Sequence, residues 1–156
     1  MVFVYENNFF ASFSKVSARQ AAEDIAGRAK SFGVTAKKVN GNDVIEVYNT
    51  TKEAVKRANE GKGPTLIEAT TYRFKGHCGC DDDIDPKLRT QEELKCWKEK
   101  CPILHLKQYL LEKNILTEQQ DKQMKQKLQK EINDAVEFGR KSPLPGEEEL
   151  LKDVFK

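Results

Sequence analysis

The stretch that decides the fold class runs from Asp43 to Arg73 and reads D-V-I-E-V-Y-N-T-T-K-E-A-V-K-R-A-N-E-G-K-G-P-T-L-I-E-A-T-T-Y-R. Asp43 is a natural helix cap, because its side-chain oxygen can accept hydrogen bonds from the free amides of the first turn. The residues that then share one largely apolar face at helical spacing are Val44, Val47, Tyr48, Thr51, Ala54, Val55 and Ala58. Gly61 ends this predicted helix, and Gly63-Pro64 forces extended backbone into a strand over residues 65–73.

The residues before this stretch repeat the alternation of strand and helix. Residues 2–5 form a short apolar run typical of a buried strand, and residues 17–32 predict a helix that Gly33 stops. Residues 35–39 predict a second strand, followed by the turn Asn40-Gly41-Asn42. The order favours an α/β fold: a partial, mostly parallel sheet of three strands with flanking helices.

Polar residues follow the first and the third predicted strands. The first strand ends in Glu6-Asn7-Asn8, and ligands bind at the carboxyl ends of strands in open parallel sheets. The third strand leads into a long acidic loop over residues 74–89, in which His77 stands between Gly76 and Cys78. Loops of that length are usually functional or disordered, so this loop is the second candidate for a site.

The second half of the chain predicts helices that follow the sheet. A capping-box pattern at Thr90 opens a helix to about residue 100, and Pro102 suits the first turn of the next helix. A second capping box at Thr117 opens a long helix to about residue 141. Its single apolar face, which we expect to be docked, consists of Met124, Leu128, Ile132 and Ala135 or Val136.

We therefore expect one incomplete domain in three parts. Residues 1–73 form the α/β part, residues 74–89 form the loop, and residues 90–156 form the helical C-terminal part.

Composition narrows the class of protein. The chain has 156 residues, of which 33% are charged, yet its net charge is only +2, so acidic and basic residues are interspersed. No basic block is interleaved with aromatic residues, which argues against nucleic-acid binding. No apolar run approaches the ~18 residues of a membrane span, and the apolar start is too short for a signal peptide. We expect a soluble, cytoplasmic protein that binds neither nucleic acid nor membranes.

The four cysteines leave two interpretations open. Cys78, Cys80, Cys96 and Cys101 lie near His77 and His105, which would suit a small structural zinc protein. Their spacing is C-x-C, fifteen residues, then C-x-x-x-x-C, which matches no common zinc pattern of paired C-x-x-C. The alternative is that they are unliganded, with Cys96 and Cys101 as small buried hydrophobes on a helix.

Several short strings occur in an order that identifies a family. They are E-N-N from Glu6, V-N-G-N-D-V from Val39, K-G-P-T-L-I-E-A-T-T-Y-R from Lys62, G-H at Gly76 and R-T-Q-E-E from Arg89. The string C-P-I-L-H-L-K-Q-Y-L-L-E from Cys101 and the closing S-P-L-P extend the match over nearly the whole chain. Together they resemble the alpha subunit of thiamine-diphosphate-dependent 2-oxo acid and acetoin dehydrogenases.

This resemblance implies a thiamine-diphosphate-binding domain that also holds magnesium. The Asn8 side chain and the Phe10 backbone carbonyl match the family's magnesium and cofactor ligands, and oxygen donors are what a hard cation requires. His77 matches the histidine that reaches the cofactor's diphosphate and the reacting centre, where imidazole can donate or shuttle a proton. Arg89 resembles the arginine that anchors the far end of the loop. Its alternative is a surface ion pair with one of Asp81–Asp83.

Two departures from the family pattern bear on what the chain can do alone. The family's G-D-G motif precedes N-N, and this sequence contains no G-D-G, so we expect a C-terminal portion of a longer alpha subunit. It would be a gene fragment or one half of a split subunit, and inactive as an isolated chain. Cys78 stands where mitochondrial members carry a regulatory serine, which favours a bacterial source.

The resemblance also implies partners and a reaction class. The partners are the missing N-terminal half, a beta subunit in a heterotetramer, and a lipoyl acyltransferase component. The enzyme would be an oxidoreductase that decarboxylates or cleaves a 2-oxo acid or acetoin-like substrate and passes the acyl group to the lipoyl partner. The loop sequence favours the bacterial acetoin dehydrogenase group. The alternative function is a non-catalytic interaction module, an orphan half-domain.

Overall fold

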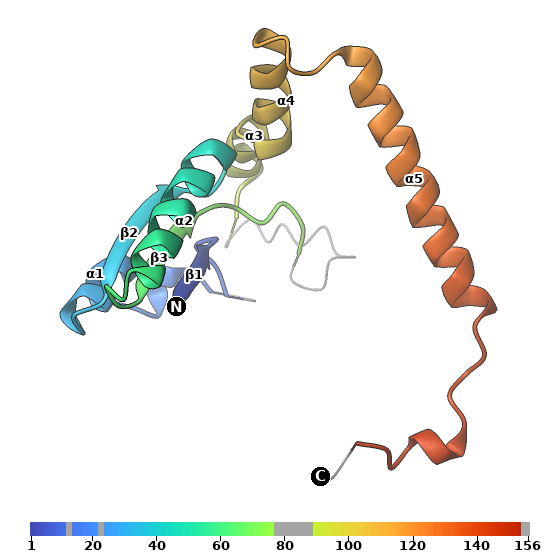
Figure 1. Cartoon of the computed structure of the whole chain (residues 1–156), viewed down its shortest axis with the longest axis horizontal. Helices are drawn as coiled ribbons and strands as arrows, with labels where there is room; N and C mark the ends of the chain where they lie inside the picture. Colours follow the sequence, from blue (N-terminus) through green and yellow to red (C-terminus); the bar gives the residue numbers. More distant parts are fainter. Residues whose placement is uncertain (12–13, 22–23, 77–88, 154–156) are drawn as a thin grey trace. The chain divides into compact units, whose positions relative to one another are not determined.

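The computed structural model describes residues 1–11, 14–21, 24–76 and 89–153 (Figure 1). The chain divides into two compact units, Met1–Tyr109 and Leu110–Lys156. The first unit contains the sheet and the candidate site. His77 and the rest of the acidic loop up to Leu88 lie outside the described residues.

Three parallel strands form the sheet of the first unit, as the sequence predicts. They are β1 (Val2–Asn7), β2 (Thr35–Asn40) and β3 (Thr65–Thr70), in the order β1-β3-β2. The central strand pairs with both neighbours over its full length, so Thr70 lies opposite both Asn7 and Asn40. Strand β3 ends at Thr70, three residues earlier than predicted, because β1 and β2 both end at that level.

One helix lies on each face of the sheet. Helix α2 (Val44–Asn59) contacts all three strands, and the core between them contains Val39, Ala54, Ile67 and Ala69. Helix α1 (Ile25–Ser31) contacts β2 and β3 (Figure 1). Successive residues of a strand point to opposite faces, so Glu68, between Ile67 and Ala69, points to the α1 side.

The predicted helix over residues 17–32 is wrong in its first half. A 3₁₀ helix, Val16–Ala18, comes first, and α1 begins only at Ile25. The Asp24 side chain accepts a hydrogen bond from the Gly27 amide at 2.8 Å and caps α1 there, so this residue starts a new helix. The predicted stop is confirmed, because Gly33 has a φ of +73°.

The cap of α2 is confirmed, but its predicted apolar face is only partly buried. Asp43 accepts hydrogen bonds from the amides of Ile45 and Glu46. Ala54 and Thr50 are buried, and Val47 packs against the core. Of the predicted face, Val44, Tyr48 and Val55 are exposed. The helix is therefore rotated about its axis relative to the prediction, so that Thr50 and Ala54 are its buried positions.

The helices after the loop begin where their caps predict. They are α3 (Gln91–Glu99), α4 (Pro102–Glu112) and α5 (Glu118–Lys141), and a 3₁₀ turn, Glu147–Glu149, follows. Thr90 caps α3, and Thr117 with Gln120 forms a complete capping box on α5. In the second unit α5 carries no buried residue, and the apolar residues Met124, Leu128, Ile132 and Val136 are exposed there. None of the described helices combines the length and the apolar character that crossing a membrane requires.

Candidate functional site at the carboxyl edge of the sheet

Hydrogen bonds tie the carboxyl ends of the three strands together. The Thr71 amide donates to the Asn7 carbonyl at 3.0 Å, and the Gly41 amide donates to the Thr70 carbonyl at 2.7 Å. The buried Asn42 side chain accepts from the Thr71 hydroxyl at 2.9 Å and donates to the Lys100 carbonyl, also at 2.9 Å. The edge at which a parallel sheet binds ligands is thus a connected backbone framework.

The turn after β1 contains two successive asparagine-capped bends. The Asn7 Oδ1 accepts from the Phe9 amide, and the Asn8 Oδ1 accepts from the Phe10 amide, each at 3.1 Å. Between them Phe9 has a φ of +67°, which is uncommon for a bulky residue. Such strain persists only where the surroundings fix it, and the Phe9 carbonyl is held by the Val16 amide at 2.8 Å.

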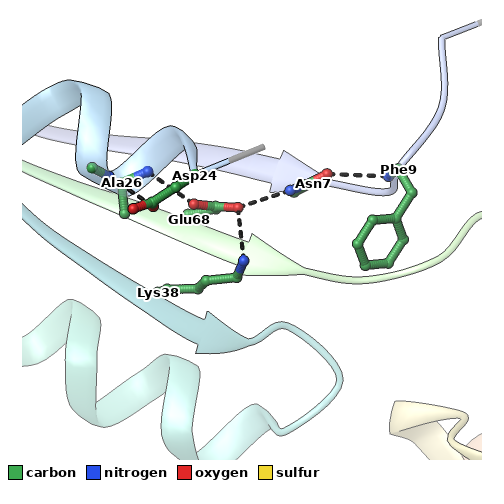
Figure 2. A network of polar contacts seen from close by, with 7 residues as sticks. Asn7, Phe9, Asp24, Ala26, Lys38 and Glu68 are labelled. Atoms are coloured by element: carbon green, nitrogen blue, oxygen red, sulfur yellow. Dashed lines mark hydrogen bonds and ion pairs between the residues drawn. The ribbon is translucent and has the colours of Figure 1, made fainter. Parts of the chain in front are cut away.

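A buried carboxylate supports this turn from the central strand (Figure 2). Glu68 is 0% exposed and Asn7 is 4% exposed, and the Asn7 Nδ2 donates to the Glu68 Oε1 at 2.8 Å. The Glu68 Oε2 accepts from the Ala26 amide in the first turn of α1 at 2.9 Å. The half-exposed Lys38 ammonium lies 3.5 Å from Oε1. The sequence pattern placed Asn7 at this edge but gave it no role, and it did not predict a role for Glu68, although a carboxylate between Ile67 and Ala69 is a visible signal.

Aromatic rings cover the other side of the turn. Phe9 lies against Trp97 of α3 with ring centroids 5.8 Å apart, and Phe10 meets the edge of Tyr72 at the same distance. Tyr72 in turn stacks on Trp97, with centroids 5.3 Å apart. This aromatic cluster of Phe9, Phe10, Tyr72 and Trp97 fixes α3 against the strand ends.

Arg89 closes the base of the acidic loop. Its guanidinium donates to the Arg73 carbonyl at 2.6 Å and to the Lys75 carbonyl at 3.3 Å, so the end of the loop is held against its beginning. The same guanidinium lies 5.7 Å from the centroid of the Phe10 ring. Arg89 is 3% exposed, so the alternative of a surface position is wrong, whereas Asp81–Asp83 lie outside the described residues.

The segment that leads to His77 is described up to Gly76. His77 lies outside the described residues, and Lys75, two positions before it, is bonded to Arg89 over the Phe10 ring. The chain therefore enters the His77 loop next to the turn that carries Asn8 and Phe10. The predicted convergence of His77 with Asn8 stays a prediction.

The Tyr72 hydroxyl is buried without a hydrogen-bond partner among the described residues. Burial raises its pKa above the usual value, the Glu93 carboxylate adds to the increase, and the Arg89 guanidinium opposes it. A buried hydroxyl without a partner costs free energy.

The two predicted magnesium ligands fit the metal in kind but not in number. The Asn8 Oδ1 accepts one hydrogen bond, and an amide oxygen has a second lone pair. Within the described ranges no donor occupies the Phe10 carbonyl oxygen. Both are neutral oxygen donors of the type that magnesium binds, but magnesium takes about six ligands, so further donors must come from elsewhere.

The described residues give no support to a zinc centre. Among them no three histidine, cysteine or acidic side chains come together as metal ligands. Cys96 is exposed and Cys101 is half-buried, so the prediction that both are buried is wrong for Cys96, which lies on the outer face of α3. The other predicted zinc ligands, His77, Cys78 and Cys80, lie outside the described residues.

Two open clefts lie near this edge. A cleft of about 210 Å³ runs along the turn after β1 and is lined by Phe9, Phe10, Lys15, Val16, Ser17 and Glu93. A larger one, of about 310 Å³, lies between the start of α2 and α4 and is lined by His105 but not by Phe10, and Asn8 lines neither of the two clefts. We place the candidate site at the smaller cleft, because it contains the strained turn and borders the aromatic cluster.

Comparison with known proteins identifies relatives over the whole length of the chain. The family model described as dehydrogenase E1 component matches residues 1–148. The pyruvate dehydrogenase E1 component subunit alpha-3, chloroplastic, of Oryza sativa subsp. japonica is 39% identical over 155 residues, which cover 99% of this chain and 36% of that protein. The corresponding alpha subunit of Rickettsia bellii (strain RML369-C) is 33% identical, with 99% and 47% covered.

A relative that is named for a different substrate is comparably similar. The 2-oxoisovalerate dehydrogenase subunit alpha of Bacillus subtilis (strain 168) is 35% identical over 155 residues, 99% of this chain and 46% of that protein. The chain thus spans less than half the length of each of these relatives.

Proposed function

Because the chain belongs to the dehydrogenase E1 component family, we propose that it is part of the alpha subunit of a thiamine-diphosphate-dependent 2-oxo acid dehydrogenase. Within that subunit it supplies one portion of the cofactor site, at the carboxyl edge of its sheet. The observation that carries this proposal is the position of Arg89, which holds the start of the His77 loop beside Phe10.

The proposed roles follow from the donors at this edge. The Asn8 side-chain oxygen and the Phe10 carbonyl bind magnesium, and His77 donates to the cofactor's diphosphate. Thiamine diphosphate supplies the carbanion chemistry when it is bound, and the protein supplies binding, orientation and electrostatics. The strained Phe9 keeps the two oxygen donors in one short turn, so both can face the same ion.

The apolar surface of β1 supports the proposal that a further part of the domain packs here. Phe3, Val4 and Tyr5 are exposed, although they belong to a strand of the sheet. Strand β1 lies at the edge of the sheet and its successive residues point to opposite faces, so apolar side chains are exposed on both faces there, as expected of an edge that another element covers. The proposed occupant is the N-terminal half of the alpha subunit, which would also supply the remaining magnesium ligands. The chain alone is expected to be inactive.

Substrate, further partners and compartment are proposed more broadly. The named substrates of the relatives, pyruvate and 2-oxoisovalerate, favour a 2-oxo acid, with acetoin kept as a second substrate to test. A beta subunit completes the active site in a heterotetramer, and a lipoyl acyltransferase takes the acyl group. A cytoplasmic location in a bacterium remains a prediction from the sequence alone.

Reconstitution tests the proposal. The chain is co-expressed with an N-terminal segment that contains G-D-G and with a beta subunit, and thiamine diphosphate binding in the presence of Mg²⁺ is measured by calorimetry. Asn8→Ala and His77→Ala should each weaken binding by about tenfold or more, because hydrogen bonds to charged groups contribute about 1.5–3 kcal/mol. His105→Ala is the matched control, since the only other histidine of the chain is exposed.

Three results would contradict or redirect the proposal. Equal loss of binding in His105→Ala would show that the effect is not specific to His77. A complex that assembles without binding thiamine diphosphate in any combination would identify the chain as an interaction module. Stoichiometric zinc in the purified chain would favour the zinc protein.

A further inference from the structure

Glu68 occupies a position that is costly for a carboxylate. It lies on the central strand, is 0% exposed, and points to the α1 face of the sheet. Its two oxygens have different partners: Oε2 accepts from the backbone amide of Ala26, and Oε1 accepts from the side chain of Asn7. A carboxylate that only had to cap α1 would need one of these contacts.

The carboxylate determines which way the Asn7 amide points. An ionised carboxylate offers only acceptors, so the Asn7 side chain must present its NH₂ group to Glu68. Its carbonyl oxygen then points the other way, where it accepts from the Phe9 amide at 3.1 Å (Figure 2). If the Asn7 amide were reversed, two donors would face each other at Phe9, and this bend would lose its hydrogen bond.

The Phe9 bend in turn determines where the two proposed magnesium ligands lie. Phe9 has a φ of +67°, a strained conformation that needs external support, and it separates Asn8 from Phe10. Relaxation of Phe9 to a negative φ would turn the Phe10 carbonyl away from the Asn8 side chain. The support runs from Glu68 through Asn7 to Phe9, and every contact in it is buried or half-buried.

We propose that Glu68 is a positioning residue for the metal-binding turn: it orients the Asn7 amide, which holds Phe9 in its strained conformation and thereby places Asn8 and Phe10. The part that concerns metal rests on the proposed function. The part that concerns the turn does not, and it can be tested without any ligand.

Glu68→Gln separates this role from the capping of α1. The glutamine has one acceptor for the Ala26 amide and the Asn7 side chain, while the half-exposed Lys38 ammonium can turn to solvent. The Ala26 amide is fixed in a helix and cannot turn. The glutamine oxygen therefore stays with Ala26, its NH₂ group faces Asn7, and the Asn7 amide must reverse. The Phe9 amide should then exchange with solvent about tenfold faster or more, while Ala26 stays protected.

A double variant that combines Asn7→Asp with Glu68→Gln should restore the protection of the Phe9 amide. A carboxylate at position 7 accepts from both the Phe9 amide and the glutamine NH₂ group, and the glutamine oxygen still accepts from Ala26. The hydrogen bonds from Ala26 through residue 68 and residue 7 to Phe9 are restored with the polarity of the pair exchanged, so Phe9 should regain its protection, whereas the Lys38 contact with position 68 is not restored. Asn7→Asp alone sets two carboxylates against each other at the 2.8 Å contact and should be the least stable of the variants.

Amide exchange followed by NMR on the whole chain is the first measurement. The inference is supported if Glu68→Gln exposes Phe9 and the double variant protects it again. It is overturned if the Phe9 exchange rate is unchanged in Glu68→Gln, or if the double variant gives no rescue. Should Glu68→Gln fail to fold, folding of the double variant supports the pairing, and its failure to fold overturns it.

The second measurement is the affinity for Mn²⁺ of the complex with the N-terminal segment and the beta subunit. It is made by electron paramagnetic resonance with thiamine diphosphate present. Glu68→Gln should weaken Mn²⁺ binding by about tenfold, the effect of losing one well-placed contact. Glu6→Gln is the matched control, because it removes an exposed carboxylate next to Asn7 without touching the amide. Equal effects in both variants would mean that charge alone matters and would overturn the positioning role.

The two measurements distinguish the inference from the proposed function. If the unsubstituted complex binds no Mn²⁺, the metal role and the proposed function fail together. If it binds Mn²⁺ and the Phe9 exchange rate does not respond to Glu68→Gln, only the positioning role fails.

Discussion

The indole ring of Trp97 lies nearly parallel to the ring of Tyr72, with 5.3 Å between centroids and 10° between planes. Tyr72 lies two residues after the end of the central strand, whereas Trp97 lies on α3, beyond the acidic loop. This contact attaches α3 to the edge of the sheet independently of the conformation of the loop. The segments on either side of the loop are therefore in contact with each other through Tyr72 and Trp97.

Trp97→Leu should lower the free energy of unfolding by about 2 kcal/mol, because it removes a large apolar contact and a stacked pair that itself contributes about 0.5–1.5 kcal/mol. Urea unfolding followed by circular dichroism measures the change. Phe138→Leu is the control, since Phe138 is an exposed aromatic residue on α5. A loss in Trp97→Leu no larger than in the control would show that the stack does not stabilise the first unit.

Tyr72→Phe should change the dependence of stability on pH. Burial raises the pKa of the Tyr72 hydroxyl in the folded state, so the folded protein keeps this proton at a pH where the unfolded chain loses it. The unfolding free energy therefore falls as the pH rises from about 10 through the folded pKa, and this decrease should be shallower in Tyr72→Phe.

At neutral pH the same substitution should be neutral or slightly stabilising, because the hydroxyl has no partner among the described residues. The exposed Tyr48 provides the control, and Tyr48→Phe should leave the alkaline decrease unchanged. Parallel alkaline unfolding curves for Tyr72→Phe and the unsubstituted protein would contradict the assignment of the pKa shift to burial.

Arg89→Met should lower the unfolding free energy by about 2–4 kcal/mol, because two backbone carbonyls lose a charged donor in a buried place. Arg89→Lys should recover less than half of the loss, since an ammonium lacks the planar fork that reaches both carbonyls. Denaturant unfolding and amide exchange of residues 73–76 measure the two effects. Arg19→Met is the control at an exposed arginine, and an equal loss there would refute the anchoring role of Arg89.

The sequence predicted the elements whose signals are local. Asp43, Thr90 and Thr117 each cap a helix through hydrogen bonds to amides two or three residues away, so the pattern alone locates the helix start. The alternation of strands and helices is also visible in short stretches of sequence, and it predicted the parallel sheet. The helix over residues 17–32 failed because Asp24 is also a local cap, and its signal was overlooked.

Contacts between distant residues could not be predicted in this way. The pairing of Asn7 with Glu68 joins residues 61 positions apart, and the face that α2 buries is set by its packing against strand residues such as Val39 and Ile67. The resemblance alone assigned Arg89 to the loop. Only the structure shows that Arg89 is buried and that its guanidinium lies over the Phe10 ring. The roles of Asn8, Phe10 and His77 rest on the resemblance, and His77 lies outside the described residues.

Gly41 is the position where a side chain is least tolerable at the carboxyl edge. A Cβ atom there would lie 2.8 Å from the Thr70 carbonyl oxygen, and that oxygen accepts a hydrogen bond from the Gly41 amide itself. Neither backbone can move without breaking the contact between the ends of β2 and β3. Gly41→Ala should therefore lower the free energy of unfolding by about 1–3 kcal/mol, the usual cost of overpacking.

Gly139→Ala is the matched control for Gly41→Ala, with the opposite expected sign. Gly139 lies inside α5, and a methyl group added there would meet no described atom within 4 Å, so alanine should stabilise that helix by about 0.5–1 kcal/mol. Urea unfolding of both variants, followed by circular dichroism, makes the comparison. If Gly41→Ala were as stable as the unsubstituted protein, the strand ends would be able to move apart to accommodate a methyl group. The claim that they form a rigid support for the Asn8–Phe10 turn would then be wrong.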